Sequence, residues 1–219
     1  MKYGESGFDV LYLLFAVLGG CFLLRRAKDG TEKKMGLAAL ILGLGDAFHL
    51  VPRVLNYFID ADFNAALGVG KFVTSVTMTL FYLLLYSVWL GFYEEKENRT
   101  LTKALWALAL LRVGLCLFPQ NGWIENKGSL TWGILRNVPF VILGAAVCLL
   151  YFRKRSGDRA FRFMWLYVLL SFAFYIPVVI GAEKVPMLGM LMLPKTICYI
   201  LMIVSFLRAV TAKTRKEKL

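Results

Sequence analysis

A small set of ionisable side chains lies inside long apolar stretches of this sequence. Charged groups placed among apolar residues are energetically costly, so they are functional candidates by default. Five of them are arginine or lysine side chains, which bind carboxylates and phosphates. The set therefore indicates an anion-binding site. Its members are Asp46, His49, Arg53, Lys71, Arg112, Arg136 and Lys195.

One polar stripe is visible in the local spacing. Asp46, His49, Arg53 and Asn56 follow one another at i, i+3, i+7 and i+10, which places them on one face of a helix. As a binding face, the stripe would use Asp46 as proton acceptor or counter-ion and His49 as a proton relay. As a structural feature, it would be an internal ion pair with hydrogen bonds between helices. Pro52 removes one backbone donor beside the stripe and loosens the helix there.

The elements that must position these residues are membrane-spanning helices. Of the 219 residues 59% are hydrophobic and only 18% are charged, whereas soluble chains carry about 25% charged residues. The charges fall in short clusters between apolar stretches of roughly 17 to 25 residues, the length that spans a bilayer. We therefore expect an all-α polytopic membrane protein, with residues 1–219 forming a single seven-helix domain. The predicted spans are 8–24, 36–58, 70–92, 101–118, 130–152, 163–182 and 187–207.

The distribution of basic residues predicts the orientation. One side of the predicted bundle carries few of them, Lys2, Lys127 and Lys184, and the other carries most. By the positive-inside rule the N-terminus lies outside and the C-terminus in the cytoplasm, as in a multi-pass protein of the cell membrane. Arg25 and Arg26 close the first span as a stop-transfer signal would, so we expect a permanent helix rather than a signal peptide. The basic side holds Arg25, Arg26, Lys28, Lys33, Lys34, Lys96, Arg99, Lys103, Arg153, Lys154, Arg155, Arg159, Arg162, Arg208, Lys213, Arg215, Lys216 and Lys218.

The intramembrane cations are predicted to lie at similar depths. At 1.5 Å per helical residue, Arg53, Arg112 and Arg136 lie about 8 to 9 Å below the outer boundary, Lys195 about 12 Å and Asp46 about 18 Å. Asp46 is then the only acid inside the spans, near the midplane. Each cation alone could snorkel to the interface. If several face inward, they form an outward-facing basic cavity for a carboxylate, a phosphate or an anionic head group.

Other residue types add little chemistry. Tyr175, with Trp132 and Tyr199, could wall the same cavity, although aromatic residues near span ends also form an interfacial belt. A single histidine excludes His-pair zinc sites, and the four cysteines lie in apolar stretches without CxxC spacing. We expect no metal and no resident cofactor. The basic residues lie at span ends rather than on a soluble face, so no nucleic-acid partner is expected either.

An internal repeat is suggested by self-comparison. AFHLVP at 47–52 and AFYIP at 173–177 occupy corresponding helices, and a lysine follows each final proline by 19 and 18 positions, at Lys71 and Lys195. Apolar bias alone also produces chance matches. The predicted layout is a repeat at about 8–92, a linker helix at about 101–118 and a parallel second repeat at about 130–208.

This three-one-three layout resembles the SWEET-type sugar transporters and, more loosely, the seven-helix bundle of microbial rhodopsins. The resemblance covers helix number and repeat order but no diagnostic motif, since neither the first nor the fifth helix has a Pro-Gln pair. The strings GDAFHLVPR, VTSVTMT and GMLMLPKT are similar to a family of bacterial seven-helix membrane proteins. That similarity implies a bacterial origin and no particular chemistry.

Three classes of function follow. The first is a solute carrier that binds an anionic small molecule in the basic cavity, with proton coupling at Asp46 or His49. The second is a membrane enzyme acting on lipid, because GDAFHLVP resembles a segment of lysoplasmalogenase-type hydrolases. That resemblance implies a second acidic site late in the chain, and the predicted spans there contain no acidic residue. The third is a sensor with retinal on Lys195, as the rhodopsin resemblance implies. We favour the carrier, and hence a non-enzymatic function.

Overall fold

The computed structural model describes the backbone of residues 2–157, 159–182 and 184–216, with side chains up to residue 212. The described chain is all-α, as predicted, and contains seven α-helices and two short 3₁₀-helices. In chain order these are α1 (Lys2–Arg26), α2 (Gly30–Phe58), α3 (Asn64–Phe92), α4 (Arg99–Cys116), η1 (Pro119–Asn121), α5 (Leu130–Arg153), α6 (Met164–Gly181), η2 (Pro186–Leu191) and α7 (Met192–Lys216).

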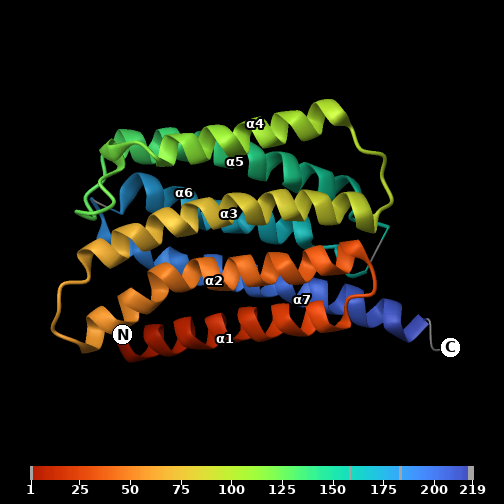
Figure 1. The fold of residues 1–219 in the computed structure, drawn as a ribbon, viewed down its shortest axis with the longest axis horizontal. Coiled ribbons are helices and arrows are strands. Elements are labelled where there is room, and N and C mark those ends of the chain that lie inside the picture. The colour runs from red at the N-terminus through yellow and green to blue at the C-terminus, as the bar shows by residue number, and fades with distance from the viewer. Residues whose placement is uncertain (1, 158, 183, 217–219) are drawn as a thin grey trace.

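Six helical segments are long and apolar enough to span a membrane: α1, α2, α3, α5, α6 and Pro186–Ala212. The chain is therefore a polytopic membrane protein. The fourth predicted span, 101–118, does not qualify by the same measure. The 18 residues of α4 include Arg99, Lys103 and Arg112, which reduce its apolar character. α4 nevertheless packs against α3 and α5 and runs beside them along the bundle (Figure 1).

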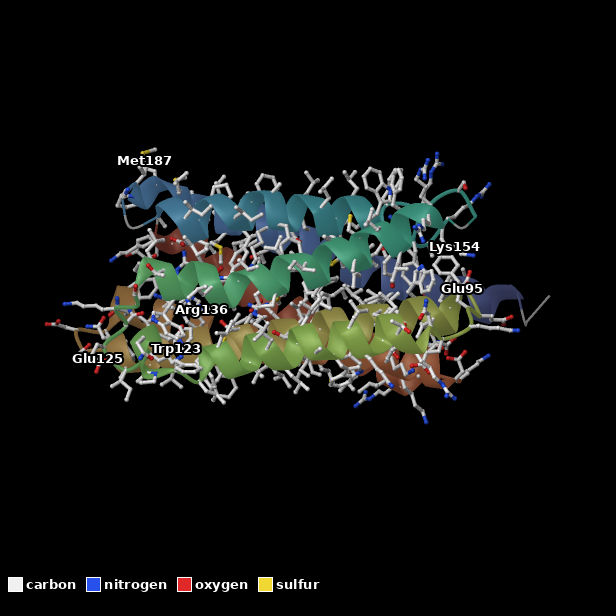
Figure 2. The ribbon with its side chains drawn as sticks, turned by 90° about the horizontal axis from the view of Figure 1, so that it is seen from above. Glu95, Trp123, Glu125, Arg136, Lys154 and Met187 are labelled. Atoms are coloured by element: carbon white, nitrogen blue, oxygen red, sulfur yellow. The ribbon has the colours of Figure 1, made fainter. Side chains whose placement is uncertain are left out.

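The helices run side by side along the long axis of the molecule, and the two termini lie at opposite ends (Figure 1). Packing follows chain order from α1 to α7, and α7 packs back against α1 and α2, so the helices form a closed ring. We call the end that holds the start of α1, the α2–α3 connection, η1 and η2 the N-end. The opposite end, with the other connections, is the C-end. At the C-end, Lys154 forms an ion pair with Glu95 (Figure 2).

α2 carries much of the predicted site, and it is held tightly between its neighbours. On one side Gly70 of α3 lies directly on the α2 backbone, where an added Cβ would be 2.7 Å from the Cα of His49. The hydroxyl of Thr74 also donates to the carbonyl of Gly45 at 3.1 Å. On the other side a Cβ at Gly43 would be 2.8 Å from the Cβ of Ala16 in α1. Small residues allow membrane helices to approach this closely, so the position of α2 is tightly defined.

An aromatic cluster fixes α3, α5 and α6 to one another. The rings of Tyr82, Phe140 and Phe172 lie with centroids 5.0 to 5.4 Å apart in tilted or edge-on geometry. The hydroxyl of Tyr82 hydrogen-bonds with Ser171 at 3.1 Å, so its polar atom is satisfied inside the core. Gly144 leaves the space that the ring of Phe172 occupies. This cluster supports the buried polar residues that lie nearer the N-end.

Three prolines lie inside helices without ending them: Pro52 in α2, Pro139 in α5 and Pro177 in α6. Pro194 is the third residue of α7. A proline within a helix lacks the donor for the carbonyl four residues earlier, so each break leaves a weaker point in the backbone. All four lie in the N-end half of their helices.

Candidate functional site

A group of polar side chains from three helices meets inside the N-end half of the bundle. The hydroxyl of Tyr12 in α1 donates to Oδ2 of Asp46 in α2 at 2.6 Å. The charge of Asp46 also interacts with Lys195 of α7 and with Asp9 of α1. Asp9, Asp46 and Lys195 are 3%, 8% and 6% exposed. We call these residues, together with His49, the inner cluster; it contains two carboxylates and one lysine.

The inner cluster borders a small cavity of about 40 Å³. Its lining includes Asp9, Asp46, His49 and Lys195, and the Nδ1 of His49 has no hydrogen-bond partner within the described part of the chain. A space of this size and polarity holds one or a few water molecules. This volume is much smaller than that of a retinal molecule.

A second, larger cavity opens at the N-end, and we call it the vestibule. It has a volume of about 470 Å³, and Lys71, Arg136, Asn137 and Tyr175 are among its lining residues. The Nζ of Lys71 donates to Asn126 at 2.7 Å. The vestibule lining includes basic and uncharged polar side chains.

Arg136 is positioned by the connection between α4 and α5. Its Nη1 donates to Oδ1 of Asn121 at 2.6 Å, and its guanidinium lies 4.3 Å from the ring centroid of Trp123. Figure 2 shows Arg136 and Trp123 together near the N-end. Asn121 is itself held because its amide donates to the carbonyls of Leu115 and Phe118, each at 2.8 Å. The connection therefore forms an ordered wall of the vestibule.

Arg112 of α4 is the most unusual charged residue of the site. It is only 2% exposed, and its guanidinium lies 3.4 Å from the ring centroid of Phe140. Its Nε and Nη1 atoms have no hydrogen-bond partner among the described residues. Cys116, one turn further along α4, interacts electrostatically with the same guanidinium. Arg112 is thus a buried cation that remains incompletely satisfied.

Tyr175 of α6 lies between the vestibule and the inner cluster. Its hydroxyl donates to Oδ1 of Asn137 at 2.8 Å on the vestibule side. On the other side the Nζ of Lys195 lies 5.0 Å from the ring centroid of Tyr175 and 5.0 Å from that of Tyr199. The charge of Arg112 also interacts with both tyrosines. Tyr175 therefore connects the vestibule with the inner cluster and with Arg112.

Two parts of the predicted polar stripe on α2 differ from expectation. Asn56 is exposed rather than part of the site. Arg53 lines the small cavity, but it also forms an ion pair with Glu5 of α1, and Glu5 accepts a hydrogen bond from Tyr57 at 3.0 Å. The structure thus brings Asp46, His49 and Lys195 together, and it provides Arg53 with an acidic partner.

The prediction that Asp46 is the only acid within the spans is wrong. α1 begins at Lys2 rather than near residue 8, so Glu5 belongs to the helix. Asp9, at the edge of the predicted span 8–24, is buried inside the bundle. Asp9 and Tyr12 are separated by three positions and share the face that meets Asp46. This spacing is visible in the sequence and was the available signal for both residues. Asn121 and Asn137 carried no comparable signal, because their roles depend on contacts with distant residues.

Within the described chain, no group of three or more His, Cys, Asp or Glu side chains could hold a metal ion. Comparisons of the chain with protein-family models, with curated proteins and with solved structures find no match.

Proposed function

We propose that the protein is a membrane carrier that binds an anionic molecule through the vestibule and Arg112. The observation that carries this proposal is the environment of Arg112, which is buried with two guanidinium nitrogens that have no hydrogen-bond partner among the residues that the structure describes. Burying a cation without a full set of partners is costly, so such a residue is retained where it serves a function. An anion bound against Arg112 would supply the missing acceptors.

The surrounding charges support an anionic ligand. The strongest electrostatic neighbours of Arg112 are Tyr175, Cys116, Tyr199 and Arg136, none of which carries a carboxylate. Lys195 also interacts with Arg112 and with Asp46 of the inner cluster. The region between the vestibule and the inner cluster is therefore positively charged. An anion entering past Arg136 would be attracted toward Arg112 and Lys195.

The proposed direction of access follows from the sequence. The excess of basic residues at the C-end indicates that this end faces the cytoplasm of a cell membrane. On this assignment α4 crosses the membrane with the other six helices, and the vestibule opens to the outside. Substrate enters there from the external solution or from the outer leaflet.

Tyr175 is the proposed barrier between the two cavities. Its position in α6 is two residues before Pro177, where the helix lacks one backbone hydrogen bond. Rotation of the N-end part of α6 would break the hydrogen bond of Tyr175 to Asn137 and open a path to Arg112. Helix breaks next to binding sites commonly serve such motions in carriers.

Proton coupling is proposed at the inner cluster. With Asp9, Asp46 and Lys195 all charged, the cluster carries one net negative charge, which one proton would neutralise. The small cavity beside it can supply water for proton transfer. Entry of an anion near Lys195 would favour uptake of that proton, so that both move together.

The first experiment measures ligand binding by thermal stability of the purified full chain in mild detergent. Inorganic phosphate and acetate are compared with chloride at constant ionic strength, since a ligand of the folded state stabilises it by mass action. Stabilisation should be lost in Arg112→Met and Arg136→Gln. Lys184→Gln is the matched control, because Lys184 is an exposed N-end cation outside the vestibule lining. Equal responses of all three variants, or none in the parent chain, would refute the anion site.

A second experiment tests coupling in vesicles that contain the reconstituted protein and an internal pH dye. An inward gradient of the stabilising anion should acidify the interior of the vesicles. Asp46→Asn is expected to abolish the acidification while anion binding remains. Acidification that survives in Asp46→Asn and in Asp9→Asn would remove the coupling proposal.

A second candidate function is hydrolysis of a lipid. It is favoured by the pairing of Asp9 with Asp46 beside a cavity of water-molecule size, since two carboxyl groups and a water are sufficient for general acid–base chemistry. To test it, the purified protein is incubated with an anionic lysolipid and the products are analysed by mass spectrometry. Turnover that disappears in Asp9→Asn and Asp46→Asn favours the enzyme; unchanged lysolipid favours the carrier.

A further inference from the structure

A groove between α5 and α6 adjoins the vestibule. It has a volume of about 220 Å³ and is bordered mainly by aliphatic side chains, among them Ile134, Val138, Ile142 and Ile180. Asn137, Tyr175 and Val179 border both the groove and the vestibule. The two spaces therefore meet, with the polar part at one side and the apolar part at the other.

We propose that the vestibule and this groove together form a site for an anionic amphiphile of the surrounding leaflet. Its acidic head group lies in the vestibule against Arg136 and Lys71, and its aliphatic chain lies in the groove. The inference rests on the proposed anion site and names the class of molecule that the site takes.

The geometry of the groove fits a chain running along the helices. Its borders recur at helical spacing, from Ile134 through Val138 to Ile142 on α5 and from Ile176 to Ile180 on α6. From Ile134 to Ile142 the groove follows α5 for about 12 Å, given 1.5 Å per residue. Among the described residues that border the groove, Asn137 and Tyr175 carry the polar side chains, and both also border the vestibule. A molecule with one polar end and a long apolar remainder matches this pattern.

The basic residues of the adjoining vestibule distinguish this site from a cavity at the other end of the bundle. A larger cavity of about 630 Å³ lies toward the C-end and includes Lys34 in its lining. Glu95 and Glu97 line the same cavity, so acidic groups oppose the lysine there. The vestibule lining instead combines Lys71 and Arg136 with uncharged polar groups. An anionic head group is therefore attracted to the N-end site in preference to the C-end cavity.

The experiment uses the full chain in nanodiscs of zwitterionic lipid and a dodecyl phosphate with a diazirine at the end of its chain. After illumination, labelled peptides are identified by mass spectrometry. Labels should concentrate within 134–142 and 175–180. An excess of unmodified dodecyl phosphate should remove them, whereas the neutral dodecyl maltoside should not.

Two matched tryptophan variants test the position of the chain. Val138→Trp fills the groove, whereas Leu135→Trp alters an equally exposed residue of the same helix turn that does not border it. Labelling should fall about tenfold in Val138→Trp and stay unchanged in Leu135→Trp. Arg136→Gln should weaken competition by dodecyl phosphate about tenfold or more, as expected for a lost charge-assisted hydrogen bond. Labels spread evenly over the lipid-facing helices, or equal effects of both tryptophans, would overturn the inference.

Inorganic phosphate separates this inference from the proposed function. Stabilisation by phosphate should persist in Val138→Trp, because phosphate needs no groove. If phosphate binds and groove labelling fails, the amphiphile site is wrong and the anion site remains. If labelling depends on Arg136 but phosphate does not bind, the amphiphile site remains and the carrier for small anions is refuted. If neither probe binds, both proposals are wrong.

Discussion

Replacing Arg112 by methionine is expected to stabilise the fold while it abolishes anion binding. Methionine has a similarly long, unbranched and adaptable side chain, so it can fill the space against Phe140 without a charge. The substitution removes a buried guanidinium with two nitrogens that have no hydrogen-bond partner in the described part of the chain. A residue kept for packing alone would show the opposite sign, because its removal would lower stability.

The expected size of the effect follows from the contacts of Arg112. Each unpartnered buried nitrogen costs about 1–3 kcal/mol, or about 2–6 kcal/mol for the two. The cation–π contact with Phe140 offsets about 2 kcal/mol of that cost. Arg112→Met should therefore raise the free energy of unfolding by about 0–4 kcal/mol, consistent with the gain of about 1–4 kcal/mol seen when buried ionic groups are replaced by apolar ones.

The assay is reversible unfolding of the purified protein in mixed detergent micelles, followed by circular dichroism. Arg53→Met serves as the control, since Arg53 is a cation of the same half of the bundle that has an acidic partner in Glu5. Its replacement should leave stability unchanged or lower it by up to about 1 kcal/mol. A loss of more than about 2 kcal/mol in Arg112→Met would refute the reasoning and make Arg112 a structural residue.

Three further outcomes test the structure itself. Tyr12→Phe should lower the free energy of unfolding by about 1.5–3 kcal/mol, because the lost hydroxyl donates to the carboxylate of Asp46. Tyr151→Phe loses a hydrogen bond to the backbone carbonyl of Leu85 and should lower it by only about 0.5–1.5 kcal/mol. Equal losses in chemical denaturation would argue against a charged Asp46. Gly70→Ala should cost about 1–3 kcal/mol in the same assay, since its methyl group meets the α2 backbone, and a neutral result would show that α2 and α3 separate easily. Lys154→Ala removes an ion pair at the C-end and should change stability by less than about 1 kcal/mol; a larger loss would show that this pair anchors the connections.

The helices were predictable from sequence because their apolar lengths match a bilayer. The predicted spans 36–58 and 130–152 lie within α2 and α5. The burial of Asp9 and the helical position of Glu5 were not predictable in the same way, because Glu5 lies before the predicted span 8–24 and Asp9 lies at its edge. The residues that they meet on α2, Arg53 and Asp46, are far away in the chain, so hydropathy alone could not show these contacts.

The types of the site residues were predictable, but their surroundings were not. The sequence placed Arg112 and Arg136 at a similar depth, and both lie in the N-end half of the bundle. Their different environments depend on rotation about the helix axes, which is set by packing. Arg112 lies against Phe140 in the core, whereas Arg136 reaches Trp123 at the vestibule. The internal repeat stays a prediction.

The contact between Arg136 and Trp123 provides the protein with an optical reporter of its own. The Nε1 of this indole donates to the carbonyl of Cys116 at 2.8 Å while its face lies under the guanidinium. An acidic molecule that draws the guanidinium away changes the polarity around the ring, and tryptophan emission responds to polarity. The chain has five tryptophans, so a variant that retains Trp123 alone would isolate this signal. Occupancy of the vestibule could then be followed by fluorescence in a native membrane, without a label and before any substrate is known.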